Sequence, residues 1–224
     1  MATSIVPYDQ RWEQSFGLER SSYMGFLELY VGATSPEMII KILSLCKALK
    51  LDPMAKPVNI VEIWNSKLKR MIPSLWLSIG GLRTLAHRTG KIAARLPAEF
   101  ADELADDAEV IVPLWCRCGY KIITGSHVYD SWGPLVYFNE VARRNNKDGT
   151  LLSMWKKMPS YMLEKVAEAA SLRAVCPEAT GGMVSSDEMD PDMSIDDAAI
   201  VSVPAVPTQR EPGDDTEIES KDGA

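Results

Sequence analysis

The chain has 224 residues, of which 46% are hydrophobic, and a formal net charge of −7; this length suits one core of ordinary size. No apolar run approaches the roughly 20 residues that a bilayer span needs, and the first residues lack the charged-then-apolar order of a secretory signal. We therefore expect a soluble, cytoplasmic protein rather than a membrane or secreted one.

Charge is divided unevenly along the chain. Residues 1–178 hold 22 Lys and Arg against 19 Asp and Glu, whereas residues 179–224 hold 2 against 12. Six acids of the first part lie in residues 99–109, and without that stretch the body carries a net +9. A basic body with segregated acid is compatible with a polyanionic partner, although a solvated surface with an acidic tail is the commoner arrangement.

The four cysteines do not form a metal-binding pattern. Cys116 and Cys118 are separated by one residue, whereas zinc knuckles use two. Only two histidines, His87 and His127, are present to complete a site. We expect no bound metal and reduced thiols, as is usual for cytoplasmic proteins.

The first predicted elements are a short N-terminal segment and a helix. Residues 1–34 are mixed in character, with an apolar stretch at 26–31 that suits either a short strand or a helix. Ser35 is a good N-cap for a helix over residues 36–49, which has Pro and Glu in its first turn. The Asp-Pro step at 52–53 ends this helix.

A β-hairpin is predicted next. Residues 57–64 are rich in β-forming side chains, a turn follows, and residues 70–79 return with apolar side chains interrupted by Pro73. The tip of this hairpin carries three cations, Lys67, Lys69 and Arg70.

The remaining body mixes helices, strands and turns. A helix over residues 80–89 turns Arg83, His87 and Arg88 outward, and Gly90 ends it just before Lys91. An acidic helix, three strands and a turn are then predicted at residues 98–109, 110–114, 120–124, 132–138 and 145–149. The chain becomes small and acidic after about residue 181, and we expect residues 191–224 to be disordered.

The stretch after Pro159 is predicted as a helix with an unusual distribution of charge. At about 100° per residue it has a polar and an apolar face, formed by Glu164, Glu168 and Ser171 and by Met162, Val166 and Ala169. Arg173 falls in the middle of the apolar arc. A guanidinium on a buried face needs an anion. The sequence leaves open whether that anion is a carboxylate of the protein or the phosphate of a ligand.

Motifs of catalysis are weak or absent. The glycines at 81 and 90 fail the spacing of a phosphate-binding loop, and neither histidine lies in a nucleophile motif. Four carboxylates would pair on shared faces of the acidic helix and could hold Mg²⁺ in a nuclease-like site, namely Asp102, Glu103, Asp106 and Asp107. A solvated acidic helix is the commoner case.

Basic and aromatic side chains are better candidates for function. Bases could stack on Trp64, Trp76, Trp132 and Trp155, although each tryptophan taken alone is more often a core residue. If the elements that carry the cations converge, a groove would bind phosphates without regard to sequence. The predicted DNA-binding residues are Lys56, Lys67, Lys69, Arg70, Arg83, Arg88, Lys91, Lys156, Lys157, Lys165 and Arg173.

Four segments, in this order, resemble the RecT/Bet (phage lambda Beta-like) family of single-strand annealing recombinases. Residues 51–56, L-D-P-M-A-K, resemble the family's G-L-[ND]-P-F-x-K. Residues 78–91, S-I-G-G-L-R-T-L-A-H-R-T-G-K, resemble S-I-D-G-F-R-x-I-A-x-R-T-G-x-Y, with Gly80 in place of the Asp. Residues 155–173 resemble W-x-x-M-P-x-x-M-L-x-K-x-A-E-A-x-A-L-R, and residues 186–189, S-D-E-M, resemble T-x-E-E-M.

The resemblance implies an α+β fold, in which a small antiparallel sheet or hairpin packs with helices in an oligomeric RecT/Redβ-like annealing core. That core would span residues 35–190, between an N-terminal segment, 1–34, that makes oligomer contacts and the acidic tail, 191–224. The implied activity is ATP-independent and involves no bond chemistry. Such proteins coat single-stranded DNA as rings or helical filaments and anneal a complementary strand in phage-type homologous recombination and DNA repair.

The resemblance also implies partners. These are single-stranded DNA, the annealed duplex, further copies of the chain, a 5′–3′ exonuclease and the host single-strand binding protein, in the cytoplasm of a bacterial host. No cofactor would be required, and a need for Mg²⁺ is left open. Lys56, Lys67, Lys69, Lys165 and Arg173 match basic positions of the family that contact DNA, and Arg83, Arg88 and Lys91 match its R…R-T-G block.

Two other functions stay open at this point. One is a metal-dependent nuclease that uses the carboxylates at 102–107, and the other is a phage scaffolding protein that ignores DNA.

Overall fold

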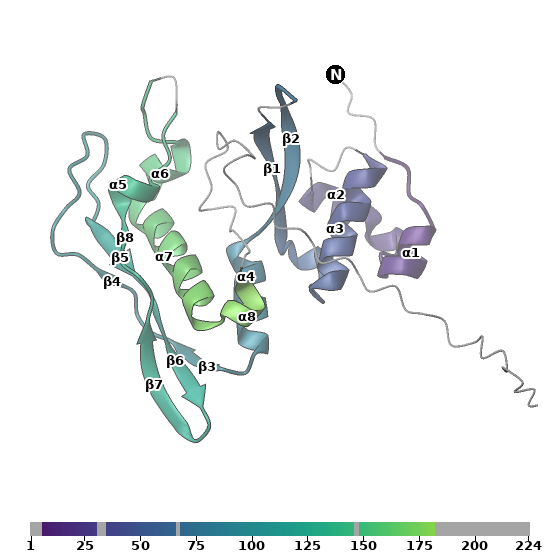
Figure 1. Cartoon of the computed structure of the whole chain (residues 1–224). Helices are drawn as coiled ribbons and strands as arrows, with labels where there is room; N and C mark the ends of the chain where they lie inside the picture. Colours follow the sequence, from purple (N-terminus) through teal and green to yellow (C-terminus); the bar gives the residue numbers. More distant parts are fainter. Residues whose placement is uncertain (1–5, 31–34, 66–67, 146–147, 182–224) are drawn as a thin grey trace, which may run out of the picture.

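The computed structural model describes residues 6–30, 35–65, 68–145 and 148–181. Three helices form the N-terminal part (Figure 1): α1 (Arg11–Phe16), α2 (Tyr23–Leu29) and α3 (Pro36–Ala48), with 3₁₀ turns η1 (Arg20–Ser22) and η2 (Pro53–Ala55). The predicted start of α3 is confirmed, because the Ser35 hydroxyl accepts a hydrogen bond from the Met38 amide at 3.2 Å. The apolar stretch whose conformation the sequence left open lies mostly in α2.

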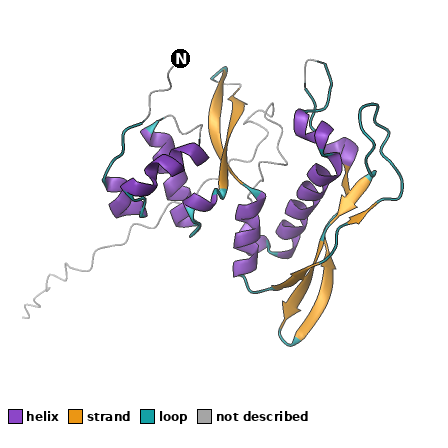
Figure 2. Ribbon diagram, turned by 180° about the vertical axis from the view of Figure 1, so that it is seen from behind, coloured by secondary structure: helices purple, strands orange, loops and turns teal. Residues whose placement is uncertain are grey.

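The predicted hairpin is also confirmed. Strand β1 (Val58–Asn65) pairs antiparallel with β2 (Arg70–Leu77), in a register that runs from Val58 opposite Leu77 to Asn65 opposite Arg70. Figure 2 shows this two-stranded ribbon rising between the N-terminal helices and the rest of the molecule. Pro73 is tolerated in β2 because a two-stranded ribbon leaves one edge of each strand unpaired.

Helix α4 (Ile79–Arg88) follows the hairpin directly. Its N-cap is Ser78, whose hydroxyl accepts from the Gly81 amide at 3.2 Å. Gly81 must lack a side chain, because a Cβ there would lie 2.4 Å from the Pro57 carbonyl oxygen at the foot of β1. The base of the hairpin and the start of α4 therefore form one tightly packed unit.

Two three-stranded antiparallel sheets make up most of the remainder. One has the order β3–β6–β7 and the other β4–β5–β8. The strands are β3 (Ile92–Arg95), β4 (Glu99–Phe100), β5 (Trp115–Arg117), β6 (Gly119–Thr124), β7 (His127–Trp132) and β8 (Val136–Tyr137). The helices are α5 (Phe138–Val141), α6 (Ser153–Lys157), α7 (Pro159–Val175) and α8 (Pro177–Thr180).

Helix α7 organises the interior because it lies between α4 on one side and β5, β6 and β8 on the other. Its C-terminal half, with Ala169 and Leu172, joins a core that also holds Phe26, Ile39 and Leu82. Its N-terminal half joins a second core, formed by Met162, Leu163, Val166 and Ala167 together with Val112, Phe138 and Trp155. The α+β class with small antiparallel sheets is thus as expected, and one helix crosses both cores.

The predictions for residues 98–138 are partly wrong. Residues 98–109 form no helix: Glu99 and Phe100 are strand β4, and the following loop is held by the Ala105 amide, which donates to the Val112 carbonyl at 2.9 Å. Residues 110–114 are irregular apart from a bridge at Pro113. The strand expected at 132–138 divides into the end of β7, β8 and the start of α5.

The predicted tail at 191–224 lies outside the described residues. No helix in the described part of the chain combines the length and apolarity that crossing a membrane requires.

Candidate nucleic-acid interface

A buried carboxylate, Glu168 of α7, lies at the centre of the polar interior, with 2% of its side chain exposed. Arg83 of α4 donates from Nε to Oε1 at 2.8 Å and from Nη2 to Oε2 at 2.6 Å. The Tyr120 hydroxyl of β6 donates to Oε1 at 3.0 Å, and Nη2 of Arg95 in β3 lies 3.5 Å from Oε2. One side chain of α7 therefore binds α4, β3 and β6 together.

Opposing effects set the charge of Glu168. Burial raises the pKa of a carboxyl, but the hydrogen bonds from Arg83, the charges of Arg83 and Arg95 and the Tyr120 hydroxyl outweigh it. The pKa of Glu168 therefore lies below its ordinary value. The hydrogen bond to Glu168 raises the pKa of Arg83 in turn. Both groups are charged at neutral pH, and the pair holds α4 against α7.

The predicted division of α7 into polar and apolar faces does not follow burial. Glu168 and Ser171 are as deeply buried as Leu163 and Ala169, because α7 is covered by α4 and by strands. The buried charge that needs a counterion is therefore the acid Glu168. Arg173, in the last turn of α7, is half-buried.

Four predicted DNA-binding cations have partners within the protein. The contacts are Arg83 with Glu168, Arg88 with the Leu49 carbonyl at 3.0 Å, Lys91 with Glu178, and Lys156 with Glu109 at 3.1 Å. Three of these partners are carboxylates, which offset the charge that a DNA phosphate would otherwise meet.

Four of the other predicted cations form no ion pair with a described residue. These exposed side chains are Lys56, Lys69, Arg70 and Lys157. Lys165, which is half-buried, places its Nζ 5.7 Å from the centroid of the Tyr161 ring. Lys67 lies outside the described residues.

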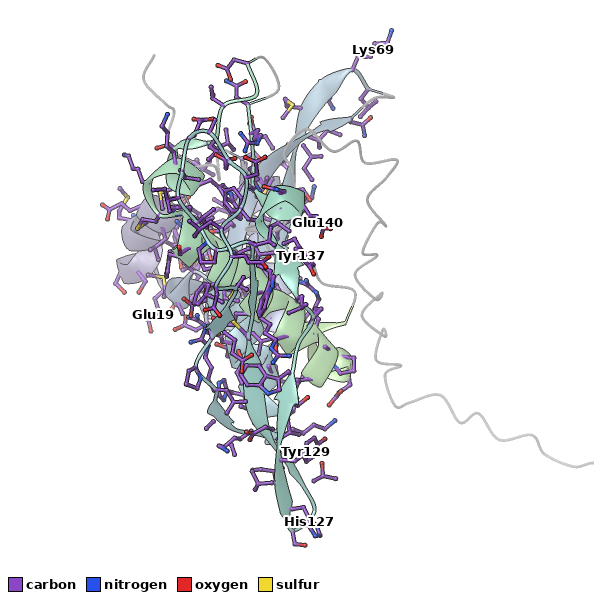
Figure 3. All side chains as sticks on the ribbon, turned by 90° about the vertical axis from the view of Figure 1, so that its left-hand side faces the viewer. Glu19, Lys69, His127, Tyr129, Tyr137 and Glu140 are labelled. Atoms are coloured by element: carbon purple, nitrogen blue, oxygen red, sulfur yellow. The ribbon has the colours of Figure 1, made fainter. Side chains whose placement is uncertain are left out.

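The hairpin cations and those of the α6–α7 junction lie toward one end of the molecule. Figure 3 places Lys69 at the tip of the β1–β2 hairpin and His127 at the opposite extreme, on the β6–β7 hairpin. Figures 1 and 2 show α6 and the start of α7 at the same end as the β1–β2 tip. The C-terminal end of α4, with Arg88 in its last turn, points toward the other end. The predicted residues thus divide into separate groups.

Two of the lysines have a left-handed backbone. Lys56 and Lys69 both have φ of +48°, a conformation that costs a residue with a side chain about 1–2 kcal/mol. The Lys56 carbonyl accepts a hydrogen bond from the Ser78 hydroxyl at 3.2 Å, and next to Lys69 the Asn65 side chain accepts one from the Leu68 amide at 2.8 Å. Glycine would adopt either backbone conformation more easily, so the backbone does not explain why lysine is present at these two positions.

Two of the four tryptophans suggested as stacking surfaces are core residues instead. Trp76 and Trp155 are 8% and 2% exposed and belong to the interior. Trp132 is half-buried, and the Arg117 guanidinium lies 4.8 Å from the centroid of its ring. Nothing is described for the side chain of Trp64. The core alternative is therefore confirmed for Trp76 and Trp155.

The acidic stretch at 99–109 neutralises basic residues of the body. Glu99 pairs with Arg117 at 2.6 Å, Asp107 pairs with Arg144, and Glu109 pairs with Arg144 at 3.5 Å as well as with Lys156. The Asp107 side chain is 2% exposed and committed to Arg144. Since the stretch is not helical, the face that the nuclease alternative required does not exist.

Within the described residues, no group of three or more acidic, histidine or cysteine side chains is arranged to hold a metal. All four cysteines are buried and form no disulfide.

Sequence reasoning missed several residues that matter. Arg95 was not singled out, although it bonds Glu164 at 2.6 Å and approaches Glu168. Its only local signal is an apolar stretch, I-A-A-R, which follows the Gly90 turn and forms β3. Arg144 and Tyr161 were missed as well. Their roles depend on partners or exposure, which no spacing reveals.

Of the comparisons with known proteins, the one with family models agrees with the resemblance seen in the sequence. No curated protein matches the chain. The model of the RecT family matches residues 20–201, which include α2, the hairpin, α4, both sheets and α7. Because this match covers most of the sequence, the chain belongs to the RecT family.

Proposed function

We propose that this protein anneals complementary single strands of DNA without ATP, as an oligomer that binds the sugar–phosphate backbone. Membership of the RecT family supports phage-type recombination by binding and annealing single-stranded DNA. The observation that carries the finer proposal is a group of cations toward one end of the molecule: Lys69 and Arg70 at the hairpin tip and Lys157 at the end of α6. Lys165, in α7, adds to this group. Lys56, at the foot of the hairpin, extends this group.

The proposed mechanism is physical and makes no covalent bond. Lysine and arginine bind phosphates and read no bases, so one strand is held without sequence preference and its base edges stay available. Neutralised backbones repel a second strand less. Stacking in duplex DNA contributes roughly 1.4 kcal/mol per step, so a matched duplex of a few tens of pairs is stable without nucleotide hydrolysis.

Self-association of the protein would extend its basic surface. One protomer presents few cations, so it covers few nucleotides. A ring or filament of protomers would align these short basic surfaces along a continuous strand.

Salt dependence gives a quantitative test. For single strands the slope of log K against log salt is about −0.7 per neutralised phosphate. Five contacts per protomer, from Lys56, Lys69, Arg70, Lys157 and Lys165, predict a slope near −3.5. Binding should therefore weaken about a hundredfold between 50 and 200 mM salt.

The experiment combines binding with annealing. Fluorescence anisotropy with two labelled oligonucleotides of unrelated sequence would measure affinity over a salt series. A second assay would follow duplex formation from complementary strands without ATP. Equal affinities for the two sequences, a steep salt dependence and faster annealing are expected. Affinity that does not change with salt, or strands that are shortened, would refute the proposal.

A matched pair of variants would test whether the β1–β2 hairpin contacts the DNA strand. Replacing Lys69 with Gln should lower the salt slope by about 0.7, because one phosphate contact is lost. Lys121→Gln is the control, since Lys121 pairs with Asp130 on the β6–β7 hairpin. Equal weakening by the hairpin variant and the control would show that only net charge matters.

A further inference from the structure

Among the described residues, the most exposed aromatic rings belong to tyrosines. Trp76 and Trp155 are buried and Trp132 is half-buried, whereas Tyr161 is 54% exposed and Tyr129 51%, compared with 37% for Phe100. A nucleic-acid base needs an accessible ring face for stacking. Tyr161 and Tyr129 are therefore the two candidates.

Tyr161 lies in the first turn of α7 beside exposed methionines. Met154 and Met158 are 47% and 43% exposed. The Met158 amide donates to the Met154 carbonyl at 2.9 Å, and the Met162 amide donates to the Met158 carbonyl at 3.0 Å, so the chain winds on from α6 into α7. We call Met154, Met158 and Tyr161 the Tyr161 patch. All three side chains are exposed in the described structure.

The charge around this patch suits a nucleotide. The Lys165 ammonium lies 5.7 Å from the Tyr161 ring centroid, one helical turn further along α7. Lys157, at the end of α6, is exposed and has no ion pair among the described residues. The neighbouring acid, Glu164, is engaged by Arg95 at 2.6 Å. A ring flanked by cations favours a stacked base with a phosphate on either side.

Tyr129 has a comparable exposure in a different setting. It lies in β7 near the tip of the β6–β7 hairpin, at the end of the molecule opposite Lys69 (Figure 3). Its neighbour Asp130 pairs with Lys121 at 2.9 Å, so the adjacent lysine charge is offset. Tyr129 is therefore a ring without the cationic surroundings of Tyr161, and it is a natural control.

We propose that Tyr161 is a stacking residue for one base of the bound single strand, with Lys157 and Lys165 contacting the adjacent phosphates. This inference rests on the proposed function and adds to it a contact with bases. Such a contact tolerates any sequence, because every base has a π-face. It would hold a base at the α6–α7 junction while phosphates are held at the hairpin.

The test varies both the tyrosine rings of the protein and the bases of the DNA strand. Wild type, Tyr161→Ala, Tyr161→Phe and Tyr129→Ala would be titrated with a labelled oligothymidine and with the same strand carrying abasic sites at regular intervals. Stacking on one ring predicts a five- to hundredfold loss of oligothymidine affinity in Tyr161→Ala. The salt slope should not change, because no cation is removed. Tyr161→Phe and Tyr129→Ala should remain within twofold of wild type.

The abasic strand supplies the decisive comparison. Wild type should bind it more weakly than oligothymidine, and Tyr161→Ala should show a smaller difference between the two strands. Wild-type affinity in Tyr161→Ala, or an equal penalty for abasic sites in both proteins, would overturn the inference while leaving the proposed function intact. A change in oligomer size without DNA, seen in Tyr161→Ala by light scattering, would assign the patch to protein contacts instead. A wild-type protein that binds no strand would overturn the proposed function itself.

Discussion

Truncating Glu168 should remove a large part of the stability of this protein. Glu168→Ala deletes the acceptor of three hydrogen bonds, two from Arg83 and one from Tyr120, and removes the charge next to Arg95. The Tyr120 residue is 1% exposed, so its hydroxyl would be left buried without this partner. Arg83 is 48% exposed and would regain contact with water.

The magnitude follows from these exposures. Breaking a buried ion pair by removing one partner costs about 3–5 kcal/mol, and the exposure of Arg83 places this case toward the lower limit. A buried hydroxyl without a partner costs about 1–3 kcal/mol and is part of the same loss. We expect Glu168→Ala to destabilise the fold by about 3–4 kcal/mol, out of a total that is typically 5–15 kcal/mol.

Urea denaturation followed by far-ultraviolet circular dichroism, at one fixed protein concentration, would measure this loss. Tyr120→Phe is the matched variant, because it removes one hydrogen bond and keeps the ring, and it should cost about 1 kcal/mol. The double variant should be less destabilised than the sum of the two, since both changes remove the same contact.

A destabilisation by Glu168→Ala of less than about 1 kcal/mol would refute this reasoning. Strictly additive losses in the double variant would likewise contradict the hydrogen bond between Glu168 and Tyr120.

Further predictions concern pH, charge and the backbone. The pKa of Glu168 is lowered in the folded protein. The ionised carboxylate therefore stabilises the fold fully above its pKa in the unfolded chain, about 4.3, and this stabilisation is lost as pH falls through its pKa in the folded protein. Glu168→Gln should flatten the fall of the urea midpoint between pH 5 and 3. Glu109→Gln should strengthen strand binding, measured by anisotropy, because Glu109 now pairs with Lys156. Lys69→Gly should raise the urea midpoint, by relieving the positive φ, yet weaken strand binding; a lower midpoint would contradict the first half. Deleting residues 191–224 should leave annealing intact and raise strand affinity, because a polyanionic tail competes for the cations; weaker binding would argue against this.

Predictions from the sequence were correct where the residues that determine an element lie within or next to that element. Ser35 caps the helix that follows it, as predicted. The hairpin over β1 and β2 was likewise predicted from two β-forming runs and a turn. In contrast, the acids at 99–109 are spaced as for a helix but lie in loops and a short strand, where they pair with distant residues such as Arg117 and Arg144.

The sequence by itself determined the family, because the order and spacing of four motifs survive in the linear chain, and it determined which residues carry the charge needed to meet phosphates. Only the tertiary structure decided which of those charges remain available. Arg83 and Glu168 are 85 positions apart and Lys156 and Glu109 are 47 apart, so folding, not spacing, neutralises them. Folding likewise buries Trp76 and Trp155 and leaves Tyr161 at the surface, because exposure depends on what the rest of the chain packs against each ring.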